Sequence, residues 1–270
     1  MLTLYREQRH HCNEYLDIDL FPVLKCSRKG KRKKKAKPTS KTQERYNHQS
    51  RVKKLERLVM TNFEQGEALF YNPSYRDEFL PTDDESAKRS LQNFFKRLKR
   101  YRKRKGLPEL KYIATTEKGK RSGRYHHHLI LNCADMSIAE LEKIWGMGYA
   151  FSSLMIFDEN GVCGLVNYFC KQKKPVAEET AEECLGNAWS ASRNLKQPKE
   201  TKRDGKISKA AARDLYELGG DASAEWEKLY PDYTLSSAKP LYNEYNGGYY
   251  ISVRMRRKPV RQRRKKGALL

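Results

Sequence analysis

Three consecutive histidines stand in a short run at residues 125–131, which reads YHHHLIL. The run has the composition of a β-strand, and side chains alternate across a strand, so His126 and His128 point to one face and His127 to the other. Two imidazoles on one face can bind a single metal ion. A polar strand face that carries histidines and binds nothing is the alternative, and the remaining sequence has to decide between them.

A carboxylate is expected beside these histidines. Residues 111–117, KYIATTE, read as a strand, and the turn that follows is long enough to bring the next strand back antiparallel to it. Glu117 closes the first strand and can then lie next to His126 and His128. Two imidazole nitrogens and a carboxylate suit Mg²⁺ or Mn²⁺ and leave positions for water and a phosphate oxygen. A surface charge beside the turn is the alternative role for Glu117.

A tyrosine and a lysine, one helical turn apart, follow further along the chain. Residues 161–174 read as a helix whose apolar stripe excludes Tyr168, and Lys171 lies three residues on. A tyrosine directed away from the core can act as a nucleophile, because a nearby ammonium favours phenolate over phenol. The chain has 17 tyrosines, so a tyrosine that merely faces solvent is the alternative.

The order of elements between residues 58 and 174 predicts the fold class. Hydrophobic periodicity indicates three helices, at 82–105, 137–145 and 161–174. Runs of β-branched and aromatic residues indicate four strands, at 58–63, 111–117, 125–132 and 149–156. The resulting order, β-α-β-β-α-β-α, predicts an α+β fold in which an antiparallel sheet has helices packed on one side, the split β-α-β arrangement.

Two of the predicted helices carry signals at their ends. Thr82 with Glu85, and Ser137 with Glu140, have the spacing of a capping box. Gly146 is expected to end the second of these helices, because glycine readily adopts the left-handed conformation of a helix C-cap.

The flanking sequences are less regular. Strand-like pieces occur at Leu2–Tyr5 and Tyr15–Leu20, SKAAARDLYEL reads as a helix, and YNEYNGGYYISVRM reads as a hairpin around Asn246 and Gly247. We therefore expect three parts along the chain. They are an N-terminal segment with a basic arm (1–50), a central domain (51–175), and a C-terminal helical and hairpin extension with a basic tail (176–270).

Charge is concentrated in two arms. The chain of 270 residues has 56 basic and 33 acidic residues, a net charge of +23. Residues 27–37 and 254–266 are densely basic and contain no acid. Such arms bind a phosphate backbone without reading its sequence, and an acidic membrane surface is the other class of polyanion that they could bind. The candidate nucleic-acid-binding residues, from both arms and the basic end of the first helix, are Arg32, Lys33, Lys34, Lys35, Arg100, Arg102, Arg104, Arg261, Arg263 and Arg264.

Several classes of protein are not indicated. No stretch has the roughly 18 apolar residues that span a bilayer, and no secretory signal is evident, so we expect a cytoplasmic protein without a membrane partner. The six cysteines show no metal-binding spacing and are expected to be free thiols. A P-loop motif for nucleotide-driven motors is absent from the sequence.

The segments YIATTE, YHHHLIL and NYFCK, in this order, resemble the motifs of the HUH endonucleases. Wider stretches within residues 35–210 look similar to the single-tyrosine replication initiators of small bacterial plasmids and phages, which are relatives of the filamentous-phage initiator. His127 stands where this superfamily usually has a hydrophobic residue. It is expected to face the helix-covered side of the sheet or to replace a neighbour as ligand.

The resemblance implies a rolling-circle replication initiator, a single-strand DNA endonuclease and ligase that nicks and rejoins origin DNA. By this resemblance His126, His128 and Glu117 hold Mg²⁺ or Mn²⁺ over the scissile phosphate. Tyr168, assisted by Lys171, attacks that phosphate and leaves a 5′-phosphotyrosine link and a free 3′-hydroxyl.

The same resemblance implies an RRM-like nuclease palm for residues 51–175. It implies single-stranded or cruciform origin DNA, a host helicase and a polymerase as partners, in the cytoplasm of a bacterial host. A transposase or relaxase would use the same chemistry. A non-catalytic nucleic-acid-binding protein on an RRM-like sheet is the alternative of another class, and it would need paired aromatic residues on the central strands, which YIATTE and YHHHLIL do not supply.

Overall fold

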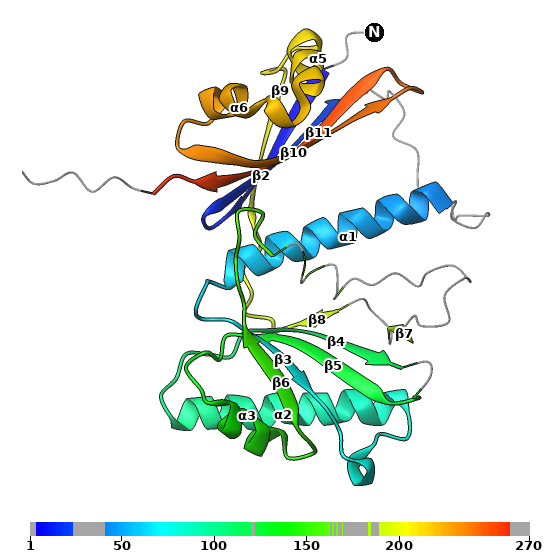
Figure 1. Cartoon of the computed structure of the whole chain (residues 1–270), viewed down its shortest axis with the longest axis vertical. Coiled ribbons are helices and arrows are strands. Elements are labelled where there is room, and N and C mark those ends of the chain that lie inside the picture. Colours follow the sequence, from blue (N-terminus) through cyan, green and yellow to red (C-terminus); the bar gives the residue numbers. More distant parts are fainter. Residues whose placement is uncertain are drawn as a thin grey trace, which may run out of the picture. The chain divides into compact units, whose positions relative to one another are not determined.

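The computed structural model forms two compact units, each with its own antiparallel sheet (Figure 1). The first unit combines Met1–Lys33 with Pro198–Leu270, and the second is Lys34–Gln197. The residues that the structure describes are 4–23, 41–119, 122–162, 164, 166, 169, 183–184 and 189–259.

The sheet of the second unit has the strand order β6-β3-β5-β4-β7, with β8 also paired to β4. Every pairing in it is antiparallel. Its strands are β3 (Leu69–Pro73), β4 (Tyr112–Lys118), β5 (Tyr125–Leu131), β6 (Ala150–Leu154), β7 (Glu183–Cys184) and β8 (Ser190–Ala191). The predicted strands at 111–117, 125–132 and 149–156 are thus present, and the α+β class is confirmed.

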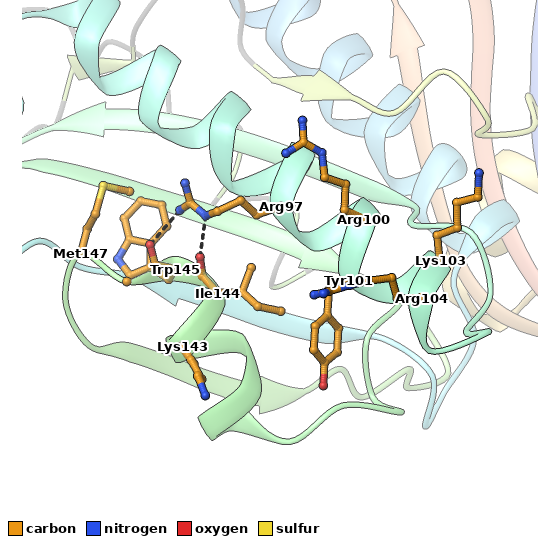
Figure 2. Close-up of a pocket in the computed structure, with 10 residues that line it drawn as sticks. Arg97, Arg100, Tyr101, Lys103, Arg104, Lys143, Ile144, Trp145 and Met147 are labelled. Atoms are coloured by element: carbon orange, nitrogen blue, oxygen red, sulfur yellow. Dashed lines mark hydrogen bonds between the residues drawn. The ribbon is translucent and has the colours of Figure 1, made fainter.

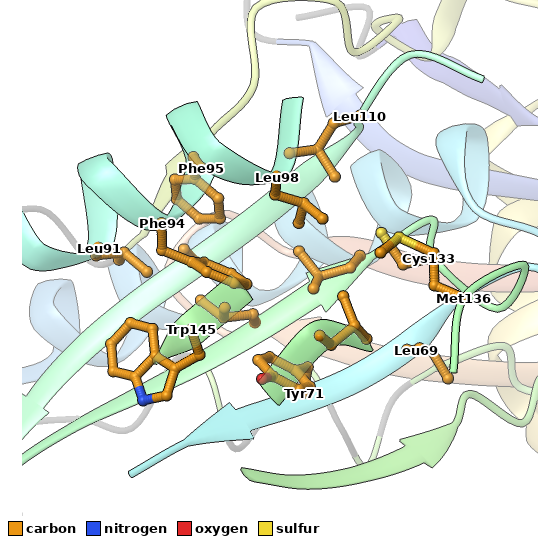
Figure 3. Close-up of a cluster of buried hydrophobic side chains, with 14 of the residues drawn as sticks. Leu69, Tyr71, Leu91, Phe94, Phe95, Leu98, Leu110, Cys133, Met136 and Trp145 are labelled. Carbon is orange, nitrogen blue, oxygen red and sulfur yellow. The ribbon is translucent and has the colours of Figure 1, made fainter. Parts of the chain in front are cut away.

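Two helices cover one face of this sheet, α2 (Asp84–Arg104) and α3 (Ile138–Trp145). Figure 1 shows α1 (Lys41–Asn62) on the other side. The apolar stripe of α2 recurs every three or four residues, so it forms one buried face against the sheet. Figure 3 shows its side chains above those of the strands, in a core that includes Leu91, Phe94, Leu98, Tyr71 and Trp145. We call this side of the sheet the helix face.

The predicted strand at 58–63 is wrong, because these residues form the last turns of α1 and the residue after it. Leu55, Leu58, Val59 and Met60 are buried at helical spacing. A short apolar run cannot be assigned to a strand or a helix by its composition alone. The first strand of the unit is β3 instead, in a segment that reads as a loop, where buried and half-buried residues alternate.

The helix caps agree with the sequence at α3 and differ at α2. Ser137 and Glu140 form the predicted capping box of α3, and Gly146 ends this helix at φ 69°. At α2 the capping box joins Asp83 and Ser86, one residue later than the predicted pair. Asp83 accepts a hydrogen bond from the Ser86 backbone N–H at 2.7 Å, and its carboxylate also suits the positive end of the helix dipole.

The sheet of the first unit is built from both ends of the sequence, in the order β10-β11-β2-β1-β9. Its strands are β1 (Leu4–Cys12), β2 (Tyr15–Val23), β9 (Lys199–Asp204), β10 (Tyr233–Asn243) and β11 (Gly248–Arg257). Helices α5 (Lys209–Leu218) and α6 (Ser223–Leu229) pack on one face. The sequence analysis places residues 1–50 and 176–270 in separate parts, whereas β2 pairs directly with β11 here. The predicted helix and the hairpin at Asn246 and Gly247 are both present.

The C-terminal basic run starts inside this sheet. Arg254 lies in β11, and its guanidinium donates to both carboxylate oxygens of Asp17, at 2.8 and 3.0 Å. Both side chains are buried. Arg254 is therefore part of the folded sheet and not of a free arm.

Two remaining expectations concern thiols and membranes. Among the described residues, Cys12 and Cys133 are free and buried, as predicted. Within the same part of the chain, no helix is both long and apolar enough to cross a bilayer.

The left-handed conformation of Gly146 generates a stability prediction. A Cβ at this position would meet only the Lys143 carbonyl oxygen, at 3.7 Å, so the cost of Gly146→Ala comes from the backbone conformation. We expect the free energy of unfolding to fall by about 1 kcal/mol, measured by urea denaturation followed by circular dichroism. Gly220→Ala is the control, because Gly220 has open space around it and no positive φ. Equal stability of the two variants would contradict the role of Gly146.

Candidate active site

The predicted metal ligands lie on the face of the second sheet that is opposite to the helix face. In the register of β4 with β5, Glu117 lies opposite His126 and Thr115 opposite His128. His128 Nε2 is 3.5 Å from Glu117 Oε2. Both side chains are buried, and Glu117 is 0% exposed. We call this side of the sheet the histidine face, defined by Asn72, Glu117 and His128.

Asn72, on β3, orients His128. Its side-chain oxygen lies 3.0 Å from His128 Nδ1, and an amide oxygen can only accept, so Nδ1 carries the proton in this arrangement. A neutral imidazole then presents the lone pair of Nε2 towards the carboxylate of Glu117. Two electron-rich atoms at this distance need a positive charge near them, either a second proton on the ring or a cation. The sequence analysis missed Asn72, because the segment around it reads as a loop.

His126 shares the face but not the cluster. A Cβ built on Gly119 would lie 3.5 Å from His126 Nε2, which places the imidazole at the turn end of the hairpin. Within the described residues, no group of three His, Cys, Asp or Glu side chains is placed to hold a metal ion. The structure therefore brings His128 and Glu117 together and leaves His126 apart from them.

His127 faces the helix side and is a core residue. Its Nε2 is 2.6 Å from the Tyr75 hydroxyl, and its Nδ1 is 2.9 Å from the Thr116 hydroxyl. Burial, and to a lesser extent the two neighbouring histidines, lowers the pKa of His127 to about 3. It is neutral at pH 7 and fully enclosed. Of its two expected roles, it takes the position on the helix-covered side and not that of a ligand.

Tyr168 and Lys171, the predicted nucleophile and its helper, lie outside the described residues. The residue that follows Tyr168 is described, and it contacts the candidate site. Phe169 is buried, and its ring lies 6.4 Å from that of His128 and 5.8 Å from that of Phe70. Phe70 in turn stacks on His128, with the two ring centroids 6.1 Å apart. The chain segment that carries Tyr168 thus contributes to the surroundings of His128.

A basic groove lies between α2 and α3 (Figure 2). Its volume is about 960 Å³, and five of the side chains that line it are cationic: Arg97, Arg100, Lys103, Arg104 and Lys143. Arg97 also donates to the carbonyl oxygens of Ile144 and Trp145, both at 2.9 Å, which joins the two helices. A groove of this charge can hold the phosphate backbone of a nucleic acid.

The predicted nucleic-acid-binding residues divide into three groups. Arg100 and Arg104 line the basic groove. Arg102 is a correction, because it is 1% exposed and donates to both carboxylate oxygens of Asp135, at 2.7 and 3.0 Å. Successive residues of a helix lie about 100° apart, so Arg102 points inward while Arg100 and Arg104 remain accessible. The arm residues, which lie outside the described chain, are Arg32, Lys33, Lys34, Lys35, Arg261, Arg263 and Arg264.

The contrast between Arg100 and Arg102 can be tested in one pair of variants. We expect Arg100→Ala to leave stability unchanged and to lower the slope of log affinity against log salt by about one for nucleic acid. We expect Arg102→Met to lower the free energy of unfolding by roughly 2 kcal/mol, since it breaks a buried ion pair with a partly exposed partner. Its DNA affinity should match the unmodified protein. Fluorescence anisotropy and urea denaturation measure the two effects, and a DNA-binding defect in folded Arg102→Met would contradict the assignment.

Comparison with known families adds one match. Residues 69–173 match a family model of replication-associated proteins, the ORF2 group. The matched stretch begins at β3 and includes Glu117, both site histidines and Tyr168. Searches of curated proteins and of solved structures gave no match. The family match supports a role in the initiation of replication.

Proposed function

We propose that this protein initiates rolling-circle replication by nicking and rejoining one strand of origin DNA through a covalent link to Tyr168. One observation carries the proposal: the stretch that matches a replication-associated family contains the buried pair of His128 and Glu117. A buried carboxylate beside an imidazole costs stability unless each is partnered, and such groups gather at functional sites.

A divalent cation fits the donors of this pair. A carboxylate oxygen and an imidazole nitrogen are ligands for Mg²⁺ or Mn²⁺, and the hydrogen bond from Asn72 holds the ring with Nε2 towards Glu117. His128 and Glu117 would hold the ion, with His126 as the expected third ligand. When bound, the ion would polarise the scissile phosphate and offset the charge that develops on its oxygens.

In the proposed reaction Tyr168 forms a bond from its phenol oxygen to phosphorus. The bond from phosphorus to the 3′-oxygen breaks, the phenol loses its proton, and the 3′-oxygen takes one up. Lys171 would favour the phenolate, since a phenol has a pKa of about 10. The products are a 5′-phosphotyrosine link and a 3′-hydroxyl that a host polymerase, working with a helicase, could extend. Attack of a 3′-hydroxyl on the link would reverse these steps and join the strand.

The basic groove would hold the DNA backbone apart from the chemistry. Its cations lie on α2 and α3, which cover the helix face, whereas the proposed reaction uses the histidine face. A transposase or relaxase would use the same reaction. Nicking of a plasmid origin in a strain that carries no other initiator would favour the replication role over these two.

We expect Tyr168→Phe to abolish the covalent adduct and the nick while leaving fold and DNA binding intact, because only the hydroxyl is removed. Lys171→Ala should slow the reaction on the order of 100-fold without stopping it. The assay is incubation with single-stranded origin DNA and Mn²⁺, followed by denaturing electrophoresis. Tyr46→Phe is the control, as an exposed tyrosine of α1. Mass spectrometry of the DNA-linked peptide tests the nucleophile directly, and a link to another tyrosine would exclude Tyr168.

We expect His126→Ala and His128→Ala each to abolish cleavage and weaken Mn²⁺ binding, measured by titration calorimetry, with little effect on non-specific DNA binding. The ligands lie on the face opposite to the basic groove, which accounts for that separation. His48→Ala, in α1, is the matched control. Retained cleavage in His128→Ala would contradict the metal assignment, and retained cleavage in His126→Ala alone would reduce the site to His128 and Glu117.

A further inference from the structure

Two aromatic side chains stand exposed at the edge of the second sheet. Tyr149 is 68% exposed and Phe151 is 64% exposed. Phe151 lies in β6, an edge strand, and Tyr149 directly precedes it. Large aromatic residues in such positions cost solubility, so their exposure calls for a ligand.

Both aromatics project on the histidine face. Phe151 lies opposite Asn72 in the register of β6 with β3, and Asn72 hydrogen-bonds His128 on that face. The Tyr149 carbonyl oxygen accepts from the Ser74 backbone N–H at 2.7 Å, so the pairing extends to this residue. Residues two apart on a strand share a face. Phe151, Asn72, His128 and Glu117 therefore follow one another across four neighbouring strands.

The segment that holds Tyr149 is closely packed. A Cβ at Gly148 would lie 2.3 Å from the Ser74 carbonyl oxygen, so only glycine fits there. The same carbonyl accepts from the Trp145 indole N–H at 2.7 Å, and the Arg76 backbone N–H donates to Met147 at 2.9 Å. The platform is thus fixed before any ligand arrives.

A cation accompanies the aromatics. The Arg76 guanidinium lies 5.3 Å from the centre of the Tyr149 ring. Its ion pair with Glu78 is long, 3.9 Å, and both side chains are more than half exposed. Arg76 can therefore turn to a phosphate next to a base stacked on Tyr149.

We propose that Tyr149 and Phe151 form a stacking platform for two bases of unpaired DNA, which leads the strand onto the histidine face. This inference rests on the proposed function. Residues two apart on a strand are roughly 6.8 Å apart, about twice the 3.4 Å spacing of bases along one strand of a duplex. Bases on the two rings are therefore separated from each other and unpaired. The platform selects an extended single strand, since a duplex keeps its bases stacked.

The test measures binding of a fluorescein-labelled 12-nucleotide oligo(dT) in EDTA, where no metal-dependent cleavage occurs. We expect Phe151→Ala and Tyr149→Ala each to weaken binding about tenfold, with an unchanged slope against log salt, because stacking releases no counterion. Arg76→Ala should lower that slope by about one. Leu154→Ala is the matched control: Leu154 is 57% exposed on the same strand, and it pairs opposite Leu69 of the helix-face core.

Two further variants separate stacking from folding. Phe151→Trp should retain affinity, since it keeps an aromatic face. Phe151→Leu should lose affinity as the alanine variant does, since it keeps apolar volume without a ring. Circular dichroism reports the fold of each protein, and only folded variants are compared.

Unchanged oligo(dT) affinity in folded Phe151→Leu and Tyr149→Ala would overturn the platform. So would a change of oligomeric state in Phe151→Leu at unchanged affinity, measured by light scattering, because the edge of β6 would then join two copies of the chain. The covalent-adduct assay separates this failure from failure of the proposed function. Adduct formation with unchanged oligo(dT) affinity removes the platform alone. Weakened oligo(dT) binding without any adduct in the unmodified protein removes the nuclease alone.

Discussion

Hydrogen bonding between β4 and β5 places Thr116 opposite His127, and from this register follow all other relations in the candidate site. Side chains alternate across a strand, so a slip of one residue would turn His127 to the histidine face and His128 into the helix core. The apolar side chains of the helix face hold the register. Leu129, for example, is completely buried among the residues of α2 and α3. The polar face is therefore fixed by hydrophobic burial on the opposite face.

The two buried faces impose different conditions on their histidines. His127 meets two hydroxyls and needs no charge, and burial keeps it neutral. His128 meets a carboxylate on one side and an amide oxygen on the other. Burial of a carboxylate without a positive partner is strongly unfavourable, so this pair gains most from a proton or a cation. Chemistry that needs a cation is thus located on the histidine face.

Separate surfaces of one small unit serve the separate tasks that we propose. The basic groove lies between α2 and α3, the pair of His128 and Glu117 lies across the sheet from it, and the exposed aromatics stand at the edge strand. A backbone can be held through charge, which acts over several ångströms and tolerates sequence differences. A scissile phosphate needs fixed donors within hydrogen-bond distance, which the paired strands provide.

The sequence by itself determined the elements with strong local signals. The periodic stripe of α2, the caps of α3 and the alternation in β5 each follow from neighbouring residues, and they predicted the α+β class and the faces of His126 and His128. Tertiary packing decided what local patterns leave open. Residues 58–63 are helical because α1 buries them at helical spacing.

Other features depend on residues far apart in the chain, so no local pattern contains them. Arg102 is structural because Asp135 lies beside it, β2 pairs with β11 across more than two hundred residues, and Asn72 reaches His128 only once β3 joins the sheet. The ring of His126 lies at the hairpin end for the same reason, since strand alternation sets a face and leaves the side-chain torsions to the surroundings.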